Sequence, residues 1–489
     1  MDPFRPASPP EARTLAASTC NPAPNCSGFR PREAFLSPLW RLVSDHLDGF
    51  LRRYNERYGH THGPLGSNVE KVWNDFLRCG DFNLGVLLLK CPECGHCLAV
   101  PTSCKTRICP SCMSRRSEDL ALTLGDVLPR VPYRHVVVTL PRLMGIRHRI
   151  REAPTLMRRI VRLATGVLKR ELRSQARGHR NRRQEFAQAL PGAVVAWSSS
   201  GDRLNFQPHL HILVTDGVFL PSGEFYGYLD WDSDRLTALV RDSVLASFTR
   251  LGLLSPEAAA TMQAWPVDRS GFRVHVETRV DPDDRDRLRT LLKYLTRCPV
   301  ALERIHYVEQ SGEVTLTTKK GATLNYRHAL DLLADLSQHI PPRGCRTLSR
   351  HGWFACALGQ FEERGRPMGE RPATPSPARP RRTPWALLIQ WVWKVEPERC
   401  PCGAMMRRSR AILERHELVR LLTALHLAGY PRRPPAAPIP EGPPVTYGAV
   451  GARRSTPPPR PGLQVPSPPL EPPQNEHNQV PPGWEDWLD

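Results

Sequence analysis

Apolar residues recur every three to four positions along the first periodic part of the chain, residues 34–90. This spacing puts Leu39 and Leu42 on one face of a helix, so we expect a helix there. A second helix is expected to begin at a capping Ser67 or Asn68. The N-terminal part of the chain is therefore predicted to be helical.

Farther along, four apolar runs are typical of strands rather than helices. They are YRHVVVTLP (133–141), AVVAW (193–197), HLHILV (209–214) and GFRVHVETRV (271–280). The last run alternates strictly, which predicts a half-buried strand with one apolar face. That face consists of Phe272, Val274, Val276, Thr278 and Val280. Helical stretches are expected between the strands, at 153–190 and 233–265.

A helix with a clear start signal follows the fourth strand. We expect Asp281 to cap it, with Pro282 at its first position. Asp283 and Asp284 would complement the positive end of its dipole. The helix thus has a predicted start immediately after the strand.

A hairpin is predicted after this helix, because EVTLTTKK (313–320) and ATLNYRH (322–328) flank Gly321. Strands mixed with helices, several of the strands antiparallel, indicate the α+β class, with an antiparallel sheet flanked by helices. The chain shows no repeat period. The segments expected are a disordered stretch at 1–33, a helical and cysteine-rich domain at 34–125, the α+β domain at 130–365, a Pro/Arg-rich linker at 371–384, a small helical module at 385–430 and a disordered Pro-rich tail at 431–489.

Charge narrows the range of partners. The chain of 489 residues carries 68 Lys and Arg against 48 Asp and Glu, a net charge of +20. Such an excess, spread along the chain, favours a nucleic acid, because each neutralised phosphate releases condensed counterions. No apolar run reaches the length of a membrane span, and the N-terminal sequence is polar and Pro-rich. We therefore expect a cytoplasmic protein that binds nucleic acid and not a membrane.

Cysteines cluster in the segment CPECGHCLAVPTSCKTRICPSC. Its pairs Cys91-x-x-Cys94 and Cys109-x-x-Cys112 have the spacing of two zinc knuckles, so we expect these four thiolates to close one tetrahedral, structural Zn²⁺ site. The alternative is a set of buried free thiols. If the four thiolates bind zinc, Cys97 and Cys104 are surplus, and His96 could compete as a ligand.

Basic residues flank the knuckles and indicate contact with DNA phosphates. They are Lys105, Arg107, Arg115 and Arg116. A shortened knuckle, CPCG at 400–403, offers only Cys400 and Cys402, so no zinc site is expected there.

Two histidines in HLHILV are candidate ligands for a divalent cation. His209 and His211 share one face of their strand, while Leu210 faces the opposite side. Two adjacent imidazoles form a chelate when a third ligand is near. The alternative is a pair of surface histidines or buried ones with satisfied hydrogen bonds.

Tyr294 is the candidate nucleophile. It lies away from the leucine stripe of its helix and beside Lys293 and Arg297, which we expect to contact DNA. A tyrosine in such a place can attack a phosphodiester and stay attached to it. The alternative is a tyrosine that only covers the edge of the helix. The leucine stripe consists of Leu288, Leu291, Leu292 and Leu295.

Several of these segments, in the same order, resemble the rolling-circle insertion-sequence transposases of the HUH type, the IS91 group and its common-region (ISCR) relatives. The segments that carry the resemblance are FLRCGDFNLG, CPECG, SCKTRICPSCMSRR, YRHVVVTLP, LNFQPHLHILVTDGVF, RVHVETRVDPDDRDRLRTLLKYLTRCPVALERI and HIPPRGCRTLSRHG, within about residues 70–355. The resemblance implies an HUH-endonuclease-like catalytic domain preceded by a zinc-binding domain.

By this resemblance His209 and His211 are ligands of a catalytic Mg²⁺ or Mn²⁺, and Tyr294 forms a 5′-phosphotyrosine with single-stranded DNA from the element ends and target. The phenol is expected to become more acidic beside the metal and nearby cations. Gln207 and Glu277 are equally good candidates for the third metal ligand. His275 lies on the same strand as Glu277, and Asp202 is a weaker candidate.

Two-tyrosine members carry a second tyrosine where this chain has Cys298, so it resembles the single-tyrosine branch. Two strand transfers would then need reuse of Tyr294, a second protomer in a homo-oligomer, or host help. The alternative functions are a replication initiator or relaxase with the same chemistry, a non-catalytic zinc-dependent DNA-binding protein, and a decayed transposase.

Overall fold

The computed structural model describes residues 27–28, 37–141, 153–176, 183–227, 229–326, 328–355, 388, 396 and 398–425. The chain forms two compact units, which we call small and large. The small unit combines Met1–Pro31, Gly80–Thr102 and Pro397–Pro431, and the large unit comprises Arg32–Cys79, Ser103–Glu396 and Arg432–Asp489. The predicted linker at 371–384 and tail at 431–489, and nearly all of 1–33, lie outside the described residues. Within the described ranges, no helix has the length and apolar character needed to cross a bilayer.

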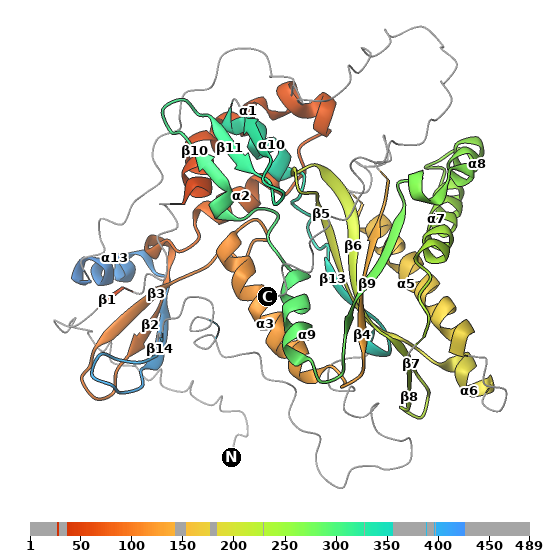
Figure 1. Cartoon of the computed structure of the whole chain (residues 1–489). Coiled ribbons are helices and arrows are strands. Elements are labelled where there is room, and N and C mark those ends of the chain that lie inside the picture. The colour runs from red at the N-terminus through yellow and green to blue at the C-terminus, as the bar shows by residue number, and fades with distance from the viewer. Residues whose placement is uncertain are drawn as a thin grey trace, which may run out of the picture. The chain divides into compact units, whose positions relative to one another are not determined.

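A five-stranded antiparallel sheet forms the centre of the large unit (Figure 1). Its strand order is β13-β5-β6-β4-β9, so β6, which carries the histidine pair, is the central strand. The strands are β4 (Tyr133–Thr139), β5 (Gly192–Ser200), β6 (Phe206–Thr215), β9 (Arg273–Val280) and β13 (Leu348–Gly352). The four strand runs recognised in the sequence all belong to this sheet, and the predicted α+β class with an antiparallel sheet is confirmed.

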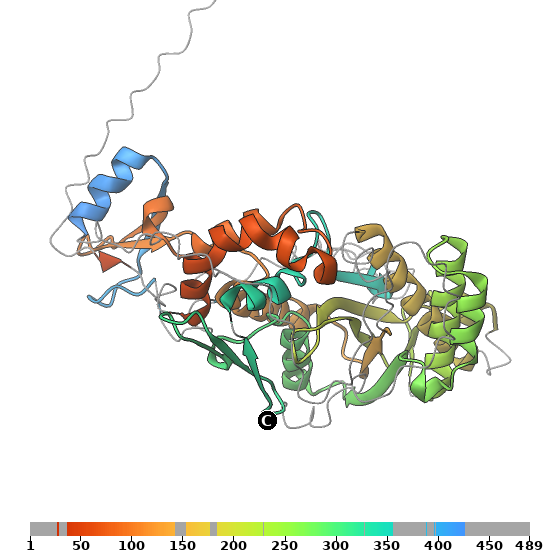
Figure 2. The same cartoon turned by 90° about the horizontal axis from the view of Figure 1, so that it is seen from above.

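Helices cover both faces of this sheet (Figures 1 and 2). On one face, Leu210, Ile212 and Val214 of β6 pack in a large apolar core with helices α5 and α7, as alternation along the strand requires. On the other face, Leu213 packs with α3 and α9. The helices are α3 (Pro110–Val127), α5 (Pro154–Ala176), α6 (Arg183–Gln188), α7 (Ser233–Arg250), α8 (Pro256–Ala264) and α9 (Arg285–Tyr294). Short elements beside them are β7 (Gly217–Phe219), β8 (Phe225–Gly227), η4 (Val267–Arg269) and η6 (Trp353–Ala355).

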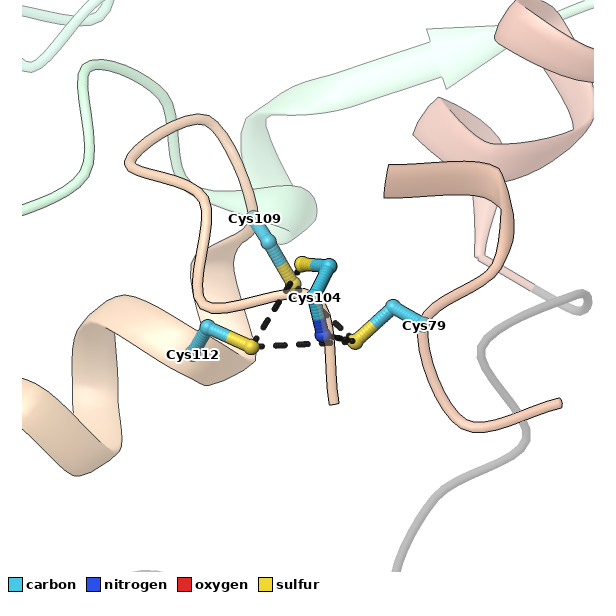
Figure 3. Close-up of side chains that lie close together, drawn as sticks. All are labelled: Cys79, Cys104, Cys109 and Cys112. Carbon is cyan, nitrogen blue, oxygen red and sulfur yellow. Dashed lines mark hydrogen bonds between the residues drawn. The ribbon is translucent and has the colours of Figure 1, made fainter. Parts of the chain in front are cut away.

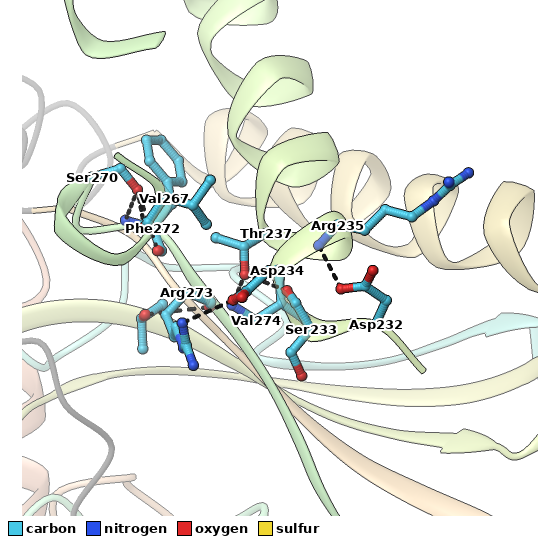
Figure 4. A network of polar contacts seen from close by, with 11 residues as sticks. Asp232, Ser233, Asp234, Arg235, Thr237, Val267, Ser270, Phe272, Arg273 and Val274 are labelled. Atoms are coloured by element: carbon cyan, nitrogen blue, oxygen red, sulfur yellow. Dashed lines mark hydrogen bonds and ion pairs between the residues drawn. The ribbon is translucent and has the colours of Figure 1, made fainter. Parts of the chain in front are cut away.

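Polar contacts fix the start of α7 against the edge strand β9 (Figure 4). The Thr237 hydroxyl donates to the Ser233 carbonyl at 2.6 Å and accepts the Val274 backbone N–H at 2.9 Å. Arg273 pairs with Asp234 at 3.2 Å. These bonds provide a partner for a backbone N–H of the edge strand and attach the start of α7 to β9.

Strand β9 departs from the predicted strict alternation. His135 of β4 pairs with Thr278 and the next residue, Val136, pairs with Val276, so Glu277 is an extra residue at a bulge. The bulge changes the side to which side chains point, so Val274 packs in the α5/α7 core and Val280 packs on the α3/α9 face.

The predicted start of α9 was also wrong. Asp281 to Asp284 form a turn in which the Asp284 N–H donates to the Asp281 carbonyl. Asp284 is the capping residue, because its carboxylate accepts the Arg287 N–H at 3.0 Å. The leucine stripe packs against the sheet as expected, and Tyr294 is the last residue of the helix.

A second core of the large unit joins the N-terminal helices to the predicted hairpin. Gly321, with φ of +80°, makes the tight turn between the two strands of that hairpin. The elements of this part are α1 (Pro38–His62), α2 (Val69–Leu77), η5 (Leu302–Arg304), β10 (Ile305–Tyr307), β11 (Val314–Thr317), β12 (Thr323–Tyr326) and α10 (Ala329–Ser337). The two expected helices and the hairpin are present.

The small unit is a sheet of order β1-β3-β2-β14 with one helix against it (Figure 1). Its elements are β1 (Ser27–Gly28), η2 (Phe82–Leu84), β2 (Val86–Lys90), β3 (Cys97–Pro101), β14 (Arg407–Ile412) and α13 (Arg415–Ala424). Two predicted segments therefore differ from the structure. Residues 80–102 separate from the rest of 34–125, and the described part of 385–430 supplies a strand as well as a helix to the same unit.

The core beneath β6 yields a stability prediction. Leu245 is 2% exposed in the α5/α7 core, whereas Leu239 of the same helix is 37% exposed. We expect Leu245→Ala to lower the free energy of unfolding by about 2–5 kcal/mol because it leaves a cavity. The control Leu239→Ala should cost less than about 1 kcal/mol. Urea unfolding followed by circular dichroism measures both, and equal losses would contradict the packing described.

Candidate functional site

Three histidines gather on the α3/α9 face of the central sheet. His211 of β6 lies opposite Val137 of β4, and His209 lies opposite Thr139, so these four side chains share one face. His135 of β4 lies on that face too, and its ring stacks on His211 with centroids 5.4 Å apart. The His209 and His211 rings are 4.8 Å apart, nearly perpendicular to each other.

The protonation of these imidazoles suits metal binding. Nδ1 of His209 lies 2.8 Å from the Gln207 carbonyl, which can only accept, so Nδ1 carries the proton and Nε2 keeps its lone pair. Burial lowers the pKa of His209, and burial with the neighbouring His209 and His135 lowers the pKa of His211 well below its ordinary value. Burial, followed by the charge of His275, lowers the pKa of His135 to about 4. All three rings are therefore neutral at neutral pH, the form in which imidazole binds metal.

The structure places Tyr294 against these histidines. The Tyr294 ring lies 5.0 Å from the His211 ring and 6.0 Å from the His135 ring, edge to face in both pairs. Burial raises the pKa of Tyr294, and the charge of Arg297 opposes that rise. The expectation of a more acidic phenol is thus not met by the protein alone, because the apolar surroundings disfavour the phenolate.

Two cations lie over the Tyr294 ring. The Arg297 guanidinium is 4.8 Å and the Lys319 ammonium 5.7 Å from the ring centroid. Lys319 lies in the turn between β11 and β12, and its backbone N–H donates to Asp202 at 2.8 Å. Burial, then the charges of Arg297 and Arg304, lower the pKa of Lys319. Positive charge is thereby concentrated beside the phenol.

The candidate third ligands occupy different places. Asp202 accepts from Arg304 at 3.2 Å as well as from Lys319, so its carboxylate fixes the hairpin turn. Gln207 lies where β6 has an extra residue relative to β5, and its amide oxygen lies against Gly201. The Glu277 side chain lies outside the described residues. Among the described His, Cys, Asp and Glu residues, only two cysteine groups bring three or more ligand atoms within 4.8 Å of one another.

The first cysteine group combines Cys79, Cys104, Cys109 and Cys112 (Figure 3). Cys79 follows α2, Cys104 lies in the loop before α3, and Cys109 and Cys112 begin α3. Neighbouring sulfur atoms are 3.6–3.8 Å apart. Because Zn–S bonds are about 2.3 Å, a tetrahedral zinc places its sulfurs about 3.8 Å apart, so this group fits the ion.

The second group combines Cys91, Cys94, Cys400 and Cys402. The two CxxC pairs therefore belong to different groups, so the prediction that they close one site was wrong, and Cys400 and Cys402, where no site was expected, lie beside Cys91 and Cys94. Each pair instead meets two cysteines from elsewhere in the chain. Cys97 packs in the apolar core of the small unit, whereas Cys104, predicted to be surplus, is part of the first group.

Contacts between α3 and α9 connect the first cysteine group to Tyr294. Lys293 pairs with Glu118 of α3 at 2.8 Å, and Arg289 pairs with Asp126 at 2.9 Å. After α9 the chain returns to the cysteine loop, where Cys298 lies 3.5 Å from the Ile108 carbonyl. The tyrosine helix is thus held at several points by the helix that begins at the cysteines. Burial raises the pKa of Cys298 to about 12, which favours its protonated thiol form at neutral pH.

The basic residues expected to contact DNA differ in their exposure and in their partners. Lys105 and Arg116 are exposed, Arg107 is half-buried, and Arg115 donates to Ser103 at 3.4 Å. Burial, with the neighbouring charge of Arg116, lowers the pKa of Arg107 to about 10. Their contacts with DNA stay predictions. Lys293, in contrast, has an acidic partner on α3.

Sequence reasoning missed three residues of this site: His135, Lys319 and Cys79. His135 carried a signal, because it alternates with Val137 in a strand run that pairs with the histidine strand. Cys79 stood in FLRCG, close before the knuckles. Lys319 had no local signal, since only the packing of the hairpin turn brings it to Tyr294.

Comparisons with known proteins match two parts of the chain to transposase families. Residues 50–140 match the family described as transposase zinc-binding domain, and residues 192–360 match the family described as putative transposase. The chain is 27% identical to the transposase for insertion sequence element IS801 of Pseudomonas savastanoi pv. phaseolicola, over 70% of this chain and 84% of that protein. It is 31% identical to the putative transposase y4qJ of Sinorhizobium fredii, over 35% of this chain and 41% of that protein. No solved structure matches the chain.

The first cysteine group predicts a specific metal loss. We expect Cys104→Ser to lower the zinc bound per chain by about one ion, because a three-thiolate site binds zinc more weakly. The control Cys345→Ser changes a thiol that contacts Met157 instead of other cysteines, and should keep its zinc. Plasma mass spectrometry of dialysed protein gives both counts. Unchanged zinc in Cys104→Ser would rule out the ligand set of Figure 3.

Proposed function

As an insertion-sequence transposase of the IS91 family, this chain processes DNA, and we propose that it nicks and rejoins single-stranded DNA through a covalent 5′-phosphotyrosine at Tyr294. The observation that carries the proposal is the contact of the Tyr294 ring with His211, 5.0 Å between centroids, on a sheet face with three neutral histidines. The substrate strand and the covalent step go beyond family membership.

The proposed step exchanges one phosphodiester for another. The Tyr294 oxygen forms a bond to phosphorus, and the bond from phosphorus to the 3′ oxygen breaks. The phenol loses its proton to solvent and the released 3′ oxygen gains one, so charge and atoms balance. A 3′-hydroxyl from another strand reverses the step and joins that strand, which requires no external energy source.

His209 and His211 are the residues that would hold the divalent cation, with Gln207 or Glu277 as candidate third ligands. When bound, Mg²⁺ or Mn²⁺ supplies positive charge to the scissile phosphate. Both histidines can act as ligands, because the Gln207 carbonyl orients His209 with Nε2 available and both rings are neutral. His135, stacked on His211, keeps that ring in place.

Arg297 and Lys319 act on the phenolate. Because burial raises the pKa of Tyr294, the oxygen needs positive charge beside it to lose its proton. The two cations over the ring supply such charge, and they are also placed to attract a phosphate backbone. The β11–β12 turn is thereby part of the proposed active site.

A single tyrosine carries out the proposed chemistry. Cys298, at the position of a second tyrosine in other members, is half-buried against the cysteine loop. Two successive strand transfers therefore need Tyr294 again, a second protomer, or a host factor. The basic surface around the first cysteine group is proposed to hold the DNA.

Removal of one oxygen atom tests the nucleophile. We expect Tyr294→Phe to abolish the denaturant-resistant protein–DNA adduct that forms with single-stranded element ends and Mn²⁺, because no oxygen remains to attack phosphorus. The control Tyr226→Phe changes a half-buried tyrosine that packs on Phe186 and should leave the adduct intact. Gel electrophoresis under denaturing conditions measures both. An adduct in Tyr294→Phe, or none in the wild type with either cation, would contradict the proposal and favour a non-catalytic DNA-binding protein.

Adjacent lysines test the role of the hairpin turn. We expect Lys319→Met to slow adduct formation on the order of tenfold, because it removes one charge beside the phenol. The matched control Lys320→Met removes the same charge one residue away, with no contact to Tyr294 among the described interactions, and should change the rate little. Single-turnover kinetics with saturating DNA separate this effect from binding. Equal rates for the two variants would exclude a specific role for Lys319.

A further inference from the structure

We propose that Cys91, Cys94, Cys400 and Cys402 form a second zinc site, which fastens the C-terminal part of the chain to the N-terminal knuckle. This site lies wholly within the small unit and does not depend on the chemistry proposed at Tyr294. It would make residues 398–425 an integral part of the cysteine-rich module rather than a separate helical module.

The sulfur positions fit a four-thiolate zinc. Cys91 and Cys402 have sulfurs 3.6 Å apart, Cys94 and Cys400 have sulfurs 3.4 Å apart, and all four lie within 4.8 Å of one another. A tetrahedral zinc with bonds of about 2.3 Å requires sulfurs about 3.8 Å apart. A disulfide would bring two sulfurs to about 2.05 Å, which none of these pairs approaches.

The backbone around the two cysteine pairs is built in the same way. At the first pair the Gly95 N–H donates to the Cys91 carbonyl, and the Cys91 N–H donates to the His96 carbonyl. At the second pair the Gly403 N–H donates to the Cys400 carbonyl, and the Cys400 N–H donates to the Ala404 carbonyl. The second turn therefore repeats the first with one residue fewer.

Glycine closes both turns. Gly95 has φ of +72° and Gly403 has φ of +91°, a conformation that other residues adopt only with strain. The missing residue in CPCG therefore shortens the knuckle without abolishing it. This explains why two cysteines separated by one residue still present both sulfurs to the same point.

Strand pairing brings the two knuckles together. β2 ends at Lys90, directly before Cys91, and Lys90 pairs with Arg407 of β14. Antiparallel pairing from Lys90 to Val86 therefore places the residues that precede β14 beside the first knuckle. The meeting of cysteines more than 300 residues apart in sequence follows from the register of one sheet.

A zinc site would stabilise the small unit, because its apolar core contains few side chains. The described core contains Phe82, Val86, Leu88, Cys97, Ala99, Ile412, Leu418, Leu422 and Leu425, and four of these belong to β14 and α13 or adjoin them. Units with so few buried side chains are usually held by metals or disulfides. Binding of zinc to a site that exists only in the folded unit adds its free energy to folding.

Zinc counting on the full-length chain tests the inference. We expect two zinc ions per wild-type chain and one in the double variant Cys400→Ser/Cys402→Ser. The control Cys97→Ser removes a thiol of the same unit whose sulfur lies 3.5 Å from the Gly95 carbonyl, and should keep two. One ion in the wild type, or a double variant with as much zinc as the control, would overturn the second site.

Alkylation supplies an independent measurement that does not require a variant to fold. Cys94 and Cys402 are exposed, so as free thiols they would react quickly with iodoacetamide. Zinc binding would protect both until a chelator is added, and peptide mass mapping identifies the modified cysteines. Rapid alkylation of Cys94 and Cys402 in zinc-loaded protein without chelator would refute the site.

Discussion

The packing of α9 on one face of the central sheet brings the candidate nucleophile beside the candidate metal ligands. Alternation along β6 sends His209 and His211 to the face opposite the large apolar core, and the leucines of α9 cover the same face. Tyr294 ends that helix, so the leucine stripe that buries α9 also carries the phenol to the histidines. A shift of α9 by one turn, about 5.4 Å, would separate these rings.

The first cysteine group gives this helix its position. It joins the end of α2 to the start of α3, and α3 holds α9 through Glu118 and Asp126. Cys298 ties the chain after α9 to the same loop. A structural zinc at these thiolates would therefore serve catalysis at a distance by fixing the helix that bears Tyr294. The first cysteine group and the α3/α9 face of the central sheet are thus parts of one scaffold within the large unit.

Features that depend on residues close together in the sequence were predicted correctly, whereas contacts between residues far apart in the sequence were not. The strands, the leucine stripe and the shared face of His209 and His211 follow from periods of two and 3.6 residues. The partners of Cys91 and Cys109 depend on strand pairing between β2 and β14 and on the approach of α2, which no local spacing encodes. One extra residue at Glu277 changes the side to which the side chains of β9 point. One turn before α9 makes Asp284, and not Asp281, the capping residue. Lys319 reaches Tyr294 only through the Asp202 contact that holds its turn.

The central claim is that Tyr294 Oη becomes bonded to DNA, and the most direct measurement locates that bond. Wild-type protein would be incubated with single-stranded element ends and Mn²⁺, denatured, and digested with protease and nuclease. Tandem mass spectrometry of the remaining peptides then identifies the residue that carries a 5′-linked nucleotide. We expect the added mass on Tyr294, in a peptide that contains the last residues of α9 (RDRLRTLLKY). The same mass on any other residue would contradict it.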